Sequence, residues 1–327
     1  MADKSFPILF VAGARIGDAV LTSGLIKRLH DEIPHARFTL AAGVPSAPLF
    51  AQTPNLDRLI VMEKRKWAGH WISLWLKTRS RRWGLVVDMR GSGLARTLSS
   101  RRRAIYRRTP GAAPVHKVIE AARVLRVEDE PPPPYLFTTP ETEQAAQDYL
   151  GVGGPILAIA PGANWVGKTW PPERFGETAA RLLAPDGPLP HGRLLVIGSQ
   201  ADREAGRMVK LAVSRDRTIG EPGQLDLLTT YACLKRVRLF IGNDSGAMHL
   251  AAAAGCPTLG LFGPSDDRLY APWGAHARAV RGPRELDAIR KIDPELNQAV
   301  CHMFDLSAET VTEAAIALLH ETEPHLV

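Results

Sequence analysis

The residues with the clearest chemical potential follow a short apolar run, Leu239–Ile241, in the last third of the chain. Next comes the turn GNDSG, residues 242–246, and then Ala247–Ala254, which are almost all good helix formers. A glycine and a proline end that helix, and Thr258–Phe262 is a second apolar run closed by another glycine. The pattern predicts a strand, a tight turn, a helix and a parallel strand.

This turn has the properties of an anion site. The N-terminus of the helix directs free N–H groups toward the carboxyl end of the first strand, where a phosphate would fit. Gly246 lets a bulky group approach the backbone, and His249 lies about one turn after Ser245 on the same helix face. The same residues also fit a simpler arrangement, in which Asp244 or Ser245 caps the helix and His249 is a buried structural residue.

Two other positions follow predicted strands in the same way. Lys168 lies in the glycine-containing loop Pro161–Pro171, directly after the strand Ile156–Ala160, where its ammonium group could neutralise a diphosphate. Glu204 follows Gly198-Ser199-Gln200 at the start of another helix, where it could accept a hydrogen bond from a ribose or a base. A solvated lysine and a glutamate that complements the helix dipole are the alternatives.

A carboxylate occupies the equivalent place near the N-terminus. The strand Ile8–Ala12 is followed by a turn that ends at Asp18, and a helix is predicted over Ala19–Glu32. Asp18 can act as a general base on a hydroxyl nucleophile, because the helix N-terminus favours its ionised form. It can equally serve only as a partner of the helix dipole.

Familiar nucleotide and metal signatures are missing. The chain has no G-x-x-x-x-G-K-[ST], and Gly13 and Gly17 lack the G-x-G-x-x-G spacing, which argues against a P-loop NTPase and a standard dehydrogenase. The predicted loops hold no D-x-D pair. Neither a metal nor another cofactor is therefore expected.

Strands alternate with helices in both halves, which predicts an α/β protein of two doubly wound, Rossmann-like domains that face each other across a cleft. The expected boundaries are residues 1–130 for the N-terminal domain, 131–140 for a stiff linker that contains Pro131–Pro134, and 141–327 for the C-terminal domain. Other predicted elements are the strand Ala104–Arg107 and the helices Gln224–Leu234 and Ala308–His320.

Charge divides the chain into two unequal parts. Residues 1–127 contain 23 Lys and Arg against eight Asp and Glu, a net charge of +15, whereas the remaining residues carry −8. The basic runs are Lys64–Lys66, Arg79–Arg82, Arg101–Arg103 and Arg107-Arg108. Such runs are usually solvated, but this excess suggests an anionic partner: a phosphorylated substrate, an anionic membrane surface or a nucleic acid.

Cysteine use and hydropathy indicate the compartment. Cys233, Cys256 and Cys301 are widely spaced and form no C-x-x-C pair, which favours a reducing environment. The apolar run Phe6–Ala12 is too short for a signal peptide, and no uncharged stretch reaches the ~18 residues of a membrane helix. A cytoplasmic protein is expected.

Four segments in this order carry a resemblance: ARIGDAVLTSGLIKRL, APGANWVGKTWPPERF, IGSQADREAG and FIGNDSGAMHLAAAAGCPTLGLFGPSD. They resemble the ADP-heptose:lipopolysaccharide heptosyltransferases, the inverting glycosyltransferases of family 9, which have the GT-B fold. Two departures stand out. Ala163 and Asn164 replace hydroxyl side chains of better-known members, and Ser245 replaces their threonine, so the phosphate contacts and the donor sugar stay open.

The resemblance implies a role for each candidate residue. Asp18 would be the base that activates an acceptor hydroxyl. Donor contacts would come from Asn164, Lys168, Glu204, Leu225, Asp244, Ser245, Gly246 and His249. Contacts to the acceptor would come from Arg15, Lys64, Arg65 and Lys66.

The implied partners are an ADP-sugar co-substrate, an anionic glycolipid acceptor and, through the basic loops, the cytoplasmic surface of the inner membrane. Alternatives are a transferase or epimerase that uses another nucleotide-sugar, and a non-catalytic protein that binds glycolipid. A nucleic-acid binder is not expected, because the basic loops show no known nucleic-acid motif.

Overall fold

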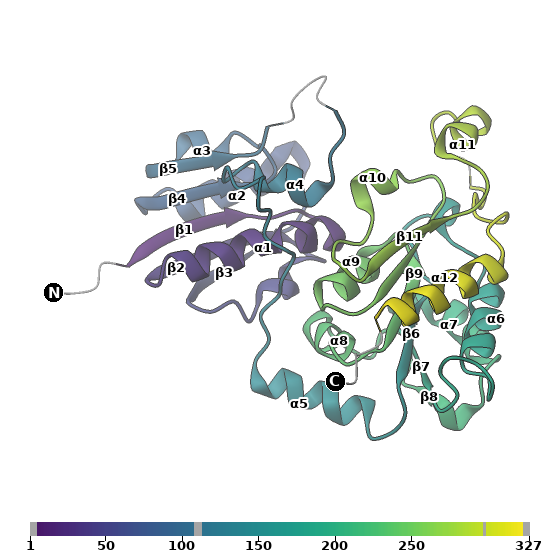
Figure 1. Ribbon diagram of the computed structural model, residues 1–327. Helices are drawn as coiled ribbons and strands as arrows, with labels where there is room; N and C mark the ends of the chain where they lie inside the picture. The colour runs from purple at the N-terminus through teal and green to yellow at the C-terminus, as the bar shows by residue number, and fades with distance from the viewer. Residues whose placement is uncertain (1–4, 108–112, 297–298, 323–327) are drawn as a thin grey trace. The chain divides into compact units, whose positions relative to one another are not determined.

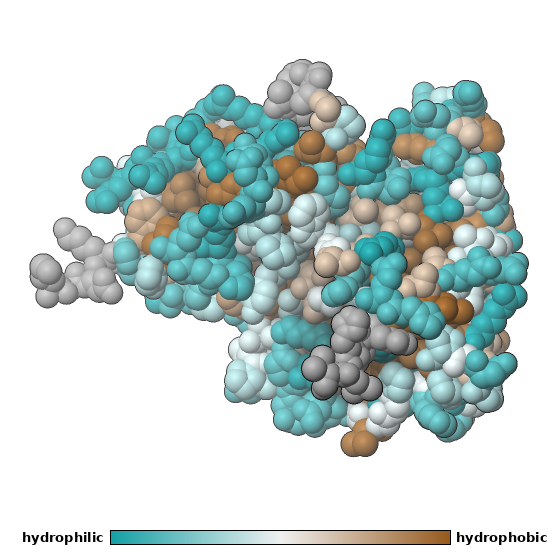
Figure 2. Space-filling model, in the orientation of Figure 1, coloured by the Kyte–Doolittle hydropathy of each residue, from teal (hydrophilic) through white to brown (hydrophobic). Residues whose placement is uncertain are grey.

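The computed structural model describes residues 5–107, 113–296 and 299–322. The chain forms two compact units, residues 1–139 and 140–327 (Figure 1). Within the described residues, no helix is both long and apolar enough to cross a membrane. On the face drawn in Figure 2, the surface of the first unit is largely hydrophilic, with apolar patches between the polar side chains.

The first unit is built on a parallel sheet in the order β3-β2-β1-β4-β5. Its strands are β1 (Phe6–Val11), β2 (Ala36–Gly43), β3 (Leu56–Met62), β4 (Trp83–Asp88) and β5 (Ser100–Ile105). β1 pairs with β2 on one side and β4 on the other. The direction of winding therefore reverses between β1 and β4, which is where doubly wound sheets bind ligands, outside the carboxyl ends of the strands.

Helices cover both faces of this sheet (Figure 1). They are α1 (Ile16–Glu32), α2 (Gly69–Thr78), α3 (Leu94–Thr97) and α4 (Lys117–Ala122), with the 3-10 helices η1 (Ala47–Phe50) and η2 (Lys66–Ala68). Leu9 and Val11 of β1 pack against Leu74 of α2 and Leu94 of α3. Alternation along the strand turns Ile8 and Phe10 to the opposite face, so β1 is buried on both sides.

The proline run lies in the first unit and packs on α1. A Cβ atom on Gly24 would lie 2.5 Å from the carbonyl oxygen of Pro132, so only glycine allows this approach. The backbone N–H of Tyr135 donates to the Ser23 hydroxyl at 2.9 Å. These contacts attach the extended segment to the helix that carries Asp18.

The second unit is built on a parallel sheet in the order β11-β10-β9-β6-β7-β8. Its strands are β6 (Ile156–Ala160), β7 (Arg193–Val196), β8 (Thr218–Ile219), β9 (Leu239–Asn243), β10 (Thr258–Phe262) and β11 (Ala277–Arg281). The winding reverses between β6 and β9, which are hydrogen-bonded neighbours. Loops that are about 80 residues apart in sequence therefore begin side by side at one edge.

Two sets of helices sandwich this sheet (Figure 1). α6 (Pro172–Leu182), α7 (Arg203–Lys210) and α12 (Ala308–Glu321) share one apolar core with it, and α5 (Pro140–Leu150), α8 (Leu227–Leu234) and α9 (Gly246–Ala253) lie on the other face. α9 approaches β10 closely, since a Cβ atom on Gly260 would lie 2.4 Å from the Met248 sulfur.

Several elements differ from those that periodicity predicts. β5 begins at Ser100 rather than Ala104, so Arg101–Arg103 belong to an edge strand. α8 begins at Leu227 rather than Gln224, because the Asp226 carboxylate caps it by accepting from the N–H groups of Leu228 and Thr229, each at 2.9 Å. β11, α10 (Asp267–Tyr270) and α11 (Leu286–Ile292) are additional.

Candidate active site

The loops after β6 and β9 meet at the edge where the second sheet reverses. The Lys168 ammonium lies 2.5 Å from Oδ2 of Asp244, across 76 residues of sequence. Asp244 is only 6% exposed, whereas Lys168 is partly open to solvent. Asn243 joins the same loops, since its side chain accepts from the N–H of Trp170 at 3.1 Å and donates to the carbonyl of Pro161 at 2.7 Å. These contacts join the two loops into one corner, which is defined by Lys168, Asn243 and Asp244.

The N-terminus of α9 opens at this corner. Ser245 is the N-cap residue and has an extended backbone, but neither its side chain nor that of Asp244 caps the helix. Within the described chain, the Ser245 hydroxyl oxygen is buried without a hydrogen-bond partner. The helix N–H groups and this hydroxyl are left available for an acceptor, as an anion site requires. His249, one turn later, is buried.

A buried histidine–carboxylate pair, His302 and Asp293, contacts the loop that carries Lys168. Nε2 of His302 lies 3.2 Å from Oδ2 of Asp293, and both side chains are almost fully buried. The backbone N–H of His302 donates to the carbonyl of Gly167 at 3.2 Å, one residue before Lys168. Nothing in the sequence links these positions, because the pair lies in a segment without a periodic pattern.

The loops after β7 and β8 lie along the same edge. Glu204, in the first turn of α7, is well exposed and lies 3.4 Å from Arg207, with no described interaction to Lys168 or Asp244. Leu225 is half-buried and precedes the Asp226 cap, and Asn164 is exposed. Burial tends to raise the pKa of Asp226, but hydrogen bonds from Thr229 and the first N–H groups of α8 outweigh it and lower that pKa.

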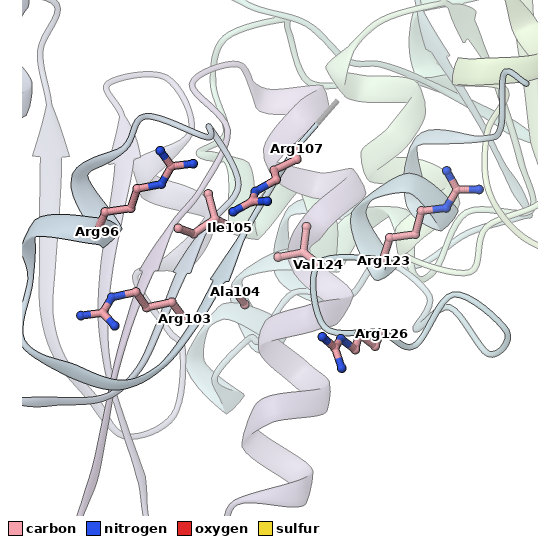
Figure 3. A pocket seen from close by; sticks show the side chains of 8 residues that line it. All are labelled: Arg96, Arg103, Ala104, Ile105, Arg107, Arg123, Val124 and Arg126. Carbon is pink, nitrogen blue, oxygen red and sulfur yellow. The ribbon is translucent and has the colours of Figure 1, made fainter. Parts of the chain in front are cut away.

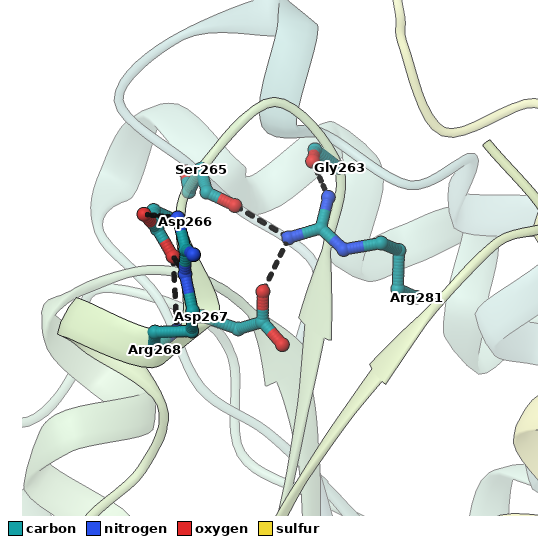
Figure 4. A network of polar contacts seen from close by, with 6 residues as sticks. All are labelled: Gly263, Ser265, Asp266, Asp267, Arg268 and Arg281. Carbon is teal, nitrogen blue, oxygen red and sulfur yellow. Dashed lines mark hydrogen bonds and ion pairs between the residues drawn. The ribbon is translucent and has the colours of Figure 1, made fainter. Parts of the chain in front are cut away.

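A network of polar contacts fixes the loop after β10 (Figure 4). The guanidinium of Arg281, from β11, donates to the carbonyls of Gly263 and Ser265 and to the carboxylate of Asp267. The Asp266 carboxylate caps α10, and the hydrogen bond from Arg268 lowers its pKa. Sequence reasoning missed Arg281 because the alternating charges of β11 did not indicate a strand.

In the first unit, Asp18 lies in the first turn of α1, just beyond the carboxyl end of β1, and both it and Arg15 are exposed. A Cβ atom on Gly13 would lie 2.7 Å from that of Asp18, so glycine is needed in this turn. The Ser46 hydroxyl donates to the Gly13 carbonyl at 2.9 Å and ties the turn to the next loop. These contacts fix the backbone of the turn that leads into the exposed residue Asp18.

Asp88 ends the adjacent strand β4 and was not singled out from the sequence. It is fully buried, and its two oxygens accept from the N–H of Arg90 and of Ser92, each at 3.0 Å, and from the Ser92 hydroxyl at 2.7 Å. These bonds assign Asp88 to holding the loop that follows β4. The carboxylates Asp18 and Asp88, at the ends of neighbouring strands, therefore differ in burial, since Asp18 is exposed and Asp88 is buried.

Lys64, Arg65 and Lys66 form an exposed loop after β3. Trp67 follows them with 94% of its surface exposed and, like Ala68, has a left-handed backbone, with φ values of 55° and 56°. A tryptophan that is both exposed and strained is costly for folding alone. Trp67 and the basic residues before it are therefore a candidate binding surface.

Residues 53–299 match the model of glycosyltransferase family 9 (heptosyltransferase). Lipopolysaccharide heptosyltransferase 2 of Escherichia coli K12 is 25% identical, over 97% of this chain and 99% of its own. A family 9 glycosyltransferase from Veillonella parvula superposes with a TM-score of 0.79 at 22% identity, over 98% and 99% of the two chains.

The E. coli ADP-heptose LPS heptosyltransferase II superposes with a TM-score of 0.75 at 20% identity, over 98% of this chain and all of the other. Together with the two doubly wound sheets, these likenesses confirm the predicted GT-B fold class. The family model spans most of the chain. The chain therefore belongs to glycosyltransferase family 9, the heptosyltransferases, and is an enzyme of that family.

Proposed function

We propose that this enzyme transfers a heptose from an ADP-heptose donor to an anionic lipopolysaccharide-core acceptor with inversion at the anomeric carbon. The observation that carries the proposal is the full-length likeness to enzymes named as lipopolysaccharide and ADP-heptose heptosyltransferases. The second unit takes the donor and the first unit takes the acceptor. The basic excess of the first unit supports an anionic acceptor.

The proposed step is a single displacement. Asp18 removes the proton from an acceptor hydroxyl as its oxygen bonds to the anomeric carbon, and the bond from that carbon to the ADP oxygen breaks. The leaving diphosphate keeps the electron pair, and Lys168 and the N–H groups of α9 stabilise its charge. Asn164, Ser245, Gly246 and His249 complete the donor site at this corner, with Glu204 and Leu225 toward the nucleoside.

Nucleotide selectivity tests the donor. Calorimetry with ADP, ADP-heptose, UDP and GDP should show binding of the adenine nucleotides at least about tenfold tighter than of the others, a difference of about 1.4 kcal/mol. Stronger binding of UDP or GDP would keep the fold and replace the donor. Absence of nucleotide binding would contradict the proposed transfer.

The enzyme is further proposed to associate peripherally with the cytoplasmic face of the inner membrane. Beside the basic loop, α2 exposes Ile72 and Leu76, which are one helical turn apart, and η2 exposes Trp67. Apolar side chains that flank Lys64–Lys66 suit an anionic lipid surface, where the rings and alkyl groups enter the headgroup layer.

Trp67→Ser should lower co-sedimentation with phosphatidylglycerol vesicles about tenfold, since burying one large apolar side chain contributes about 1.5–3 kcal/mol. Leu211→Ser is the matched control, because Leu211 is also highly exposed but lies in the acidic second unit. Equal binding to phosphatidylcholine vesicles, or equal loss in both variants, would contradict this association.

A further inference from the structure

A pocket of about 470 Å³ lies in the first unit, apart from the loops described above (Figure 3). Its lining residues are Arg96, Arg103, Ala104, Ile105, Arg107, Arg123, Val124 and Arg126. The arginines come from α3, from β5 and the residues after it, and from the turn after α4. In Figure 3, the apolar side chains Ala104, Ile105 and Val124 lie between the arginines, and no acidic residue lines the pocket.

Within the described parts of the chain, the positive charge of this pocket is not neutralised by ion pairs. Among the described residues, no carboxylate lies within 4 Å of the five guanidinium groups. The charge of Arg123 helps to lower the pKa of Glu120, but the hydrogen bonds of the Glu120 carboxylate come from Lys117 and from the Tyr106 hydroxyl. Five like charges around one hollow repel one another, and a bound anion relieves that repulsion.

Among the described residues, Arg103 has a structural contact, and three of the other pocket arginines make no side-chain hydrogen bond. Arg103 donates to the carbonyls of Ala95 at 2.8 Å and Leu98 at 2.7 Å, which holds α3 against β5. Arg96, Arg107 and Arg126 make no side-chain hydrogen bond that the described chain records, and all three are exposed. Their guanidinium groups are available to form paired hydrogen bonds with a phosphate.

The backbone of Arg126 adds an independent argument. Its φ is +61°, the left-handed conformation that commonly ends a helix and that glycine adopts without strain. An arginine at this position is therefore less favourable for the fold than a glycine would be.

We propose that this arginine pocket binds a phosphate group and is a second anion subsite, separate from the basic loop Lys64–Lys66. That the phosphate belongs to the acceptor glycolipid rests on the proposed function, whereas the phosphate chemistry rests on the pocket alone. A planar guanidinium pairs with two oxygens of one phosphate, so a pocket rimmed by several of them suits a diphosphate or two neighbouring phosphate monoesters.

Pyrophosphate binding to the full chain, measured by calorimetry with ADP saturating the donor site, tests the subsite. Arg96→Ala combined with Arg126→Gly should weaken pyrophosphate binding at least about tenfold, since each hydrogen bond between charged groups is worth more than a neutral one. Arg102→Ala is the control, because this substitution removes a positive charge from the same strand, β5, at a position that does not line the pocket.

The single variant Arg126→Gly tests whether a loss of pyrophosphate binding is due to misfolding. Glycine relieves the left-handed strain, so this variant should keep or raise its melting temperature while pyrophosphate binding falls. Unchanged pyrophosphate affinity in both arginine variants would overturn the proposal. So would weaker binding to duplex DNA with pyrophosphate affinity intact.

Two further probes identify the source of the phosphate. If the double variant has a lower affinity than wild type for core lipopolysaccharide, if this difference disappears after phosphatase treatment of the lipopolysaccharide, and if binding to phosphatidylglycerol vesicles is unchanged, the phosphate belongs to the acceptor. An equal loss of affinity for those vesicles assigns the phosphate to a lipid headgroup. ADP affinity should be unchanged in the double variant. If the wild type fails to bind ADP while the double variant binds pyrophosphate more weakly than the wild type does, the proposed donor is rejected and the pocket is kept.

Discussion

Asp18→Asn should lower kcat for sugar transfer by about 10³-fold and leave the affinity for ADP nearly unchanged, because general-base catalysis contributes about 10²- to 10⁴-fold. Asparagine has the same shape but cannot accept the proton. Asp18 is exposed, and the turn before it is held by the close packing at Gly13 and by the Ser46 hydroxyl. The substitution should therefore remove chemistry without removing structure.

The loss of one favourable charge at the helix N-terminus should cost about 0.3–1 kcal/mol of stability. Asp31→Asn is the matched control, since Asp31 is an exposed carboxylate at the other end of α1, paired with Lys27. Its kcat should stay within about twofold of wild type, because exposed ion pairs contribute little. Near-normal turnover by Asp18→Asn would refute the assignment of the base, and a large drop in both variants would point to a damaged helix.

Strands with strong apolar runs were predictable from the sequence. The predicted Ile156–Ala160 and Thr258–Phe262 match β6 and β10, since both strands are buried on both faces and read as continuous apolar stretches. β11 was not predictable in this way. Its sequence ARAVR alternates small apolar residues with arginine, as suits an edge strand that pairs with β10 alone.

The candidate site shows the same division. That a helix begins at the turn after β9 follows from residues adjacent in sequence, and the sequence predicted it, whereas the absence of a side-chain cap from Ser245 was left open. The pairing of Lys168 with Asp244 and the support of Gly167 by His302 were not predictable, because they join segments far apart in the chain. Local spacing fixes which side chains leave a turn, but tertiary packing decides which of them meet.

The ion pair between Lys168 and Asp244 lowers the net positive charge at the proposed diphosphate site. A lysine already neutralised by a buried carboxylate attracts a diphosphate less than a free one. The ammonium group, however, has three donors, and Asp244 occupies one of them at 2.5 Å. We infer that Asp244 holds the ammonium in place while its remaining N–H groups bind the leaving diphosphate.

Lys168→Met should therefore weaken ADP binding by about 10- to 100-fold, since a hydrogen bond to a charged group is worth about 1.5–3 kcal/mol. It should also lower the stability of the second unit by about 1–3 kcal/mol, because Asp244 is then buried without its partner. Methionine keeps the length of the side chain, so packing changes little. Calorimetry with ADP and denaturant unfolding measure the two effects separately.

The double variant Lys168→Met/Asp244→Asn separates structure from binding. Stability should return to within about 1 kcal/mol of wild type, because no unpaired charge is left beside the α9 N-terminus. The coupling energy between the two positions should be about 0.5–3 kcal/mol, as is typical of residues in contact. ADP affinity should stay as low as in Lys168→Met. Recovery of ADP affinity together with stability would show that Lys168 serves only as the counter-charge of Asp244, and the diphosphate would then depend on the N–H groups of α9 alone.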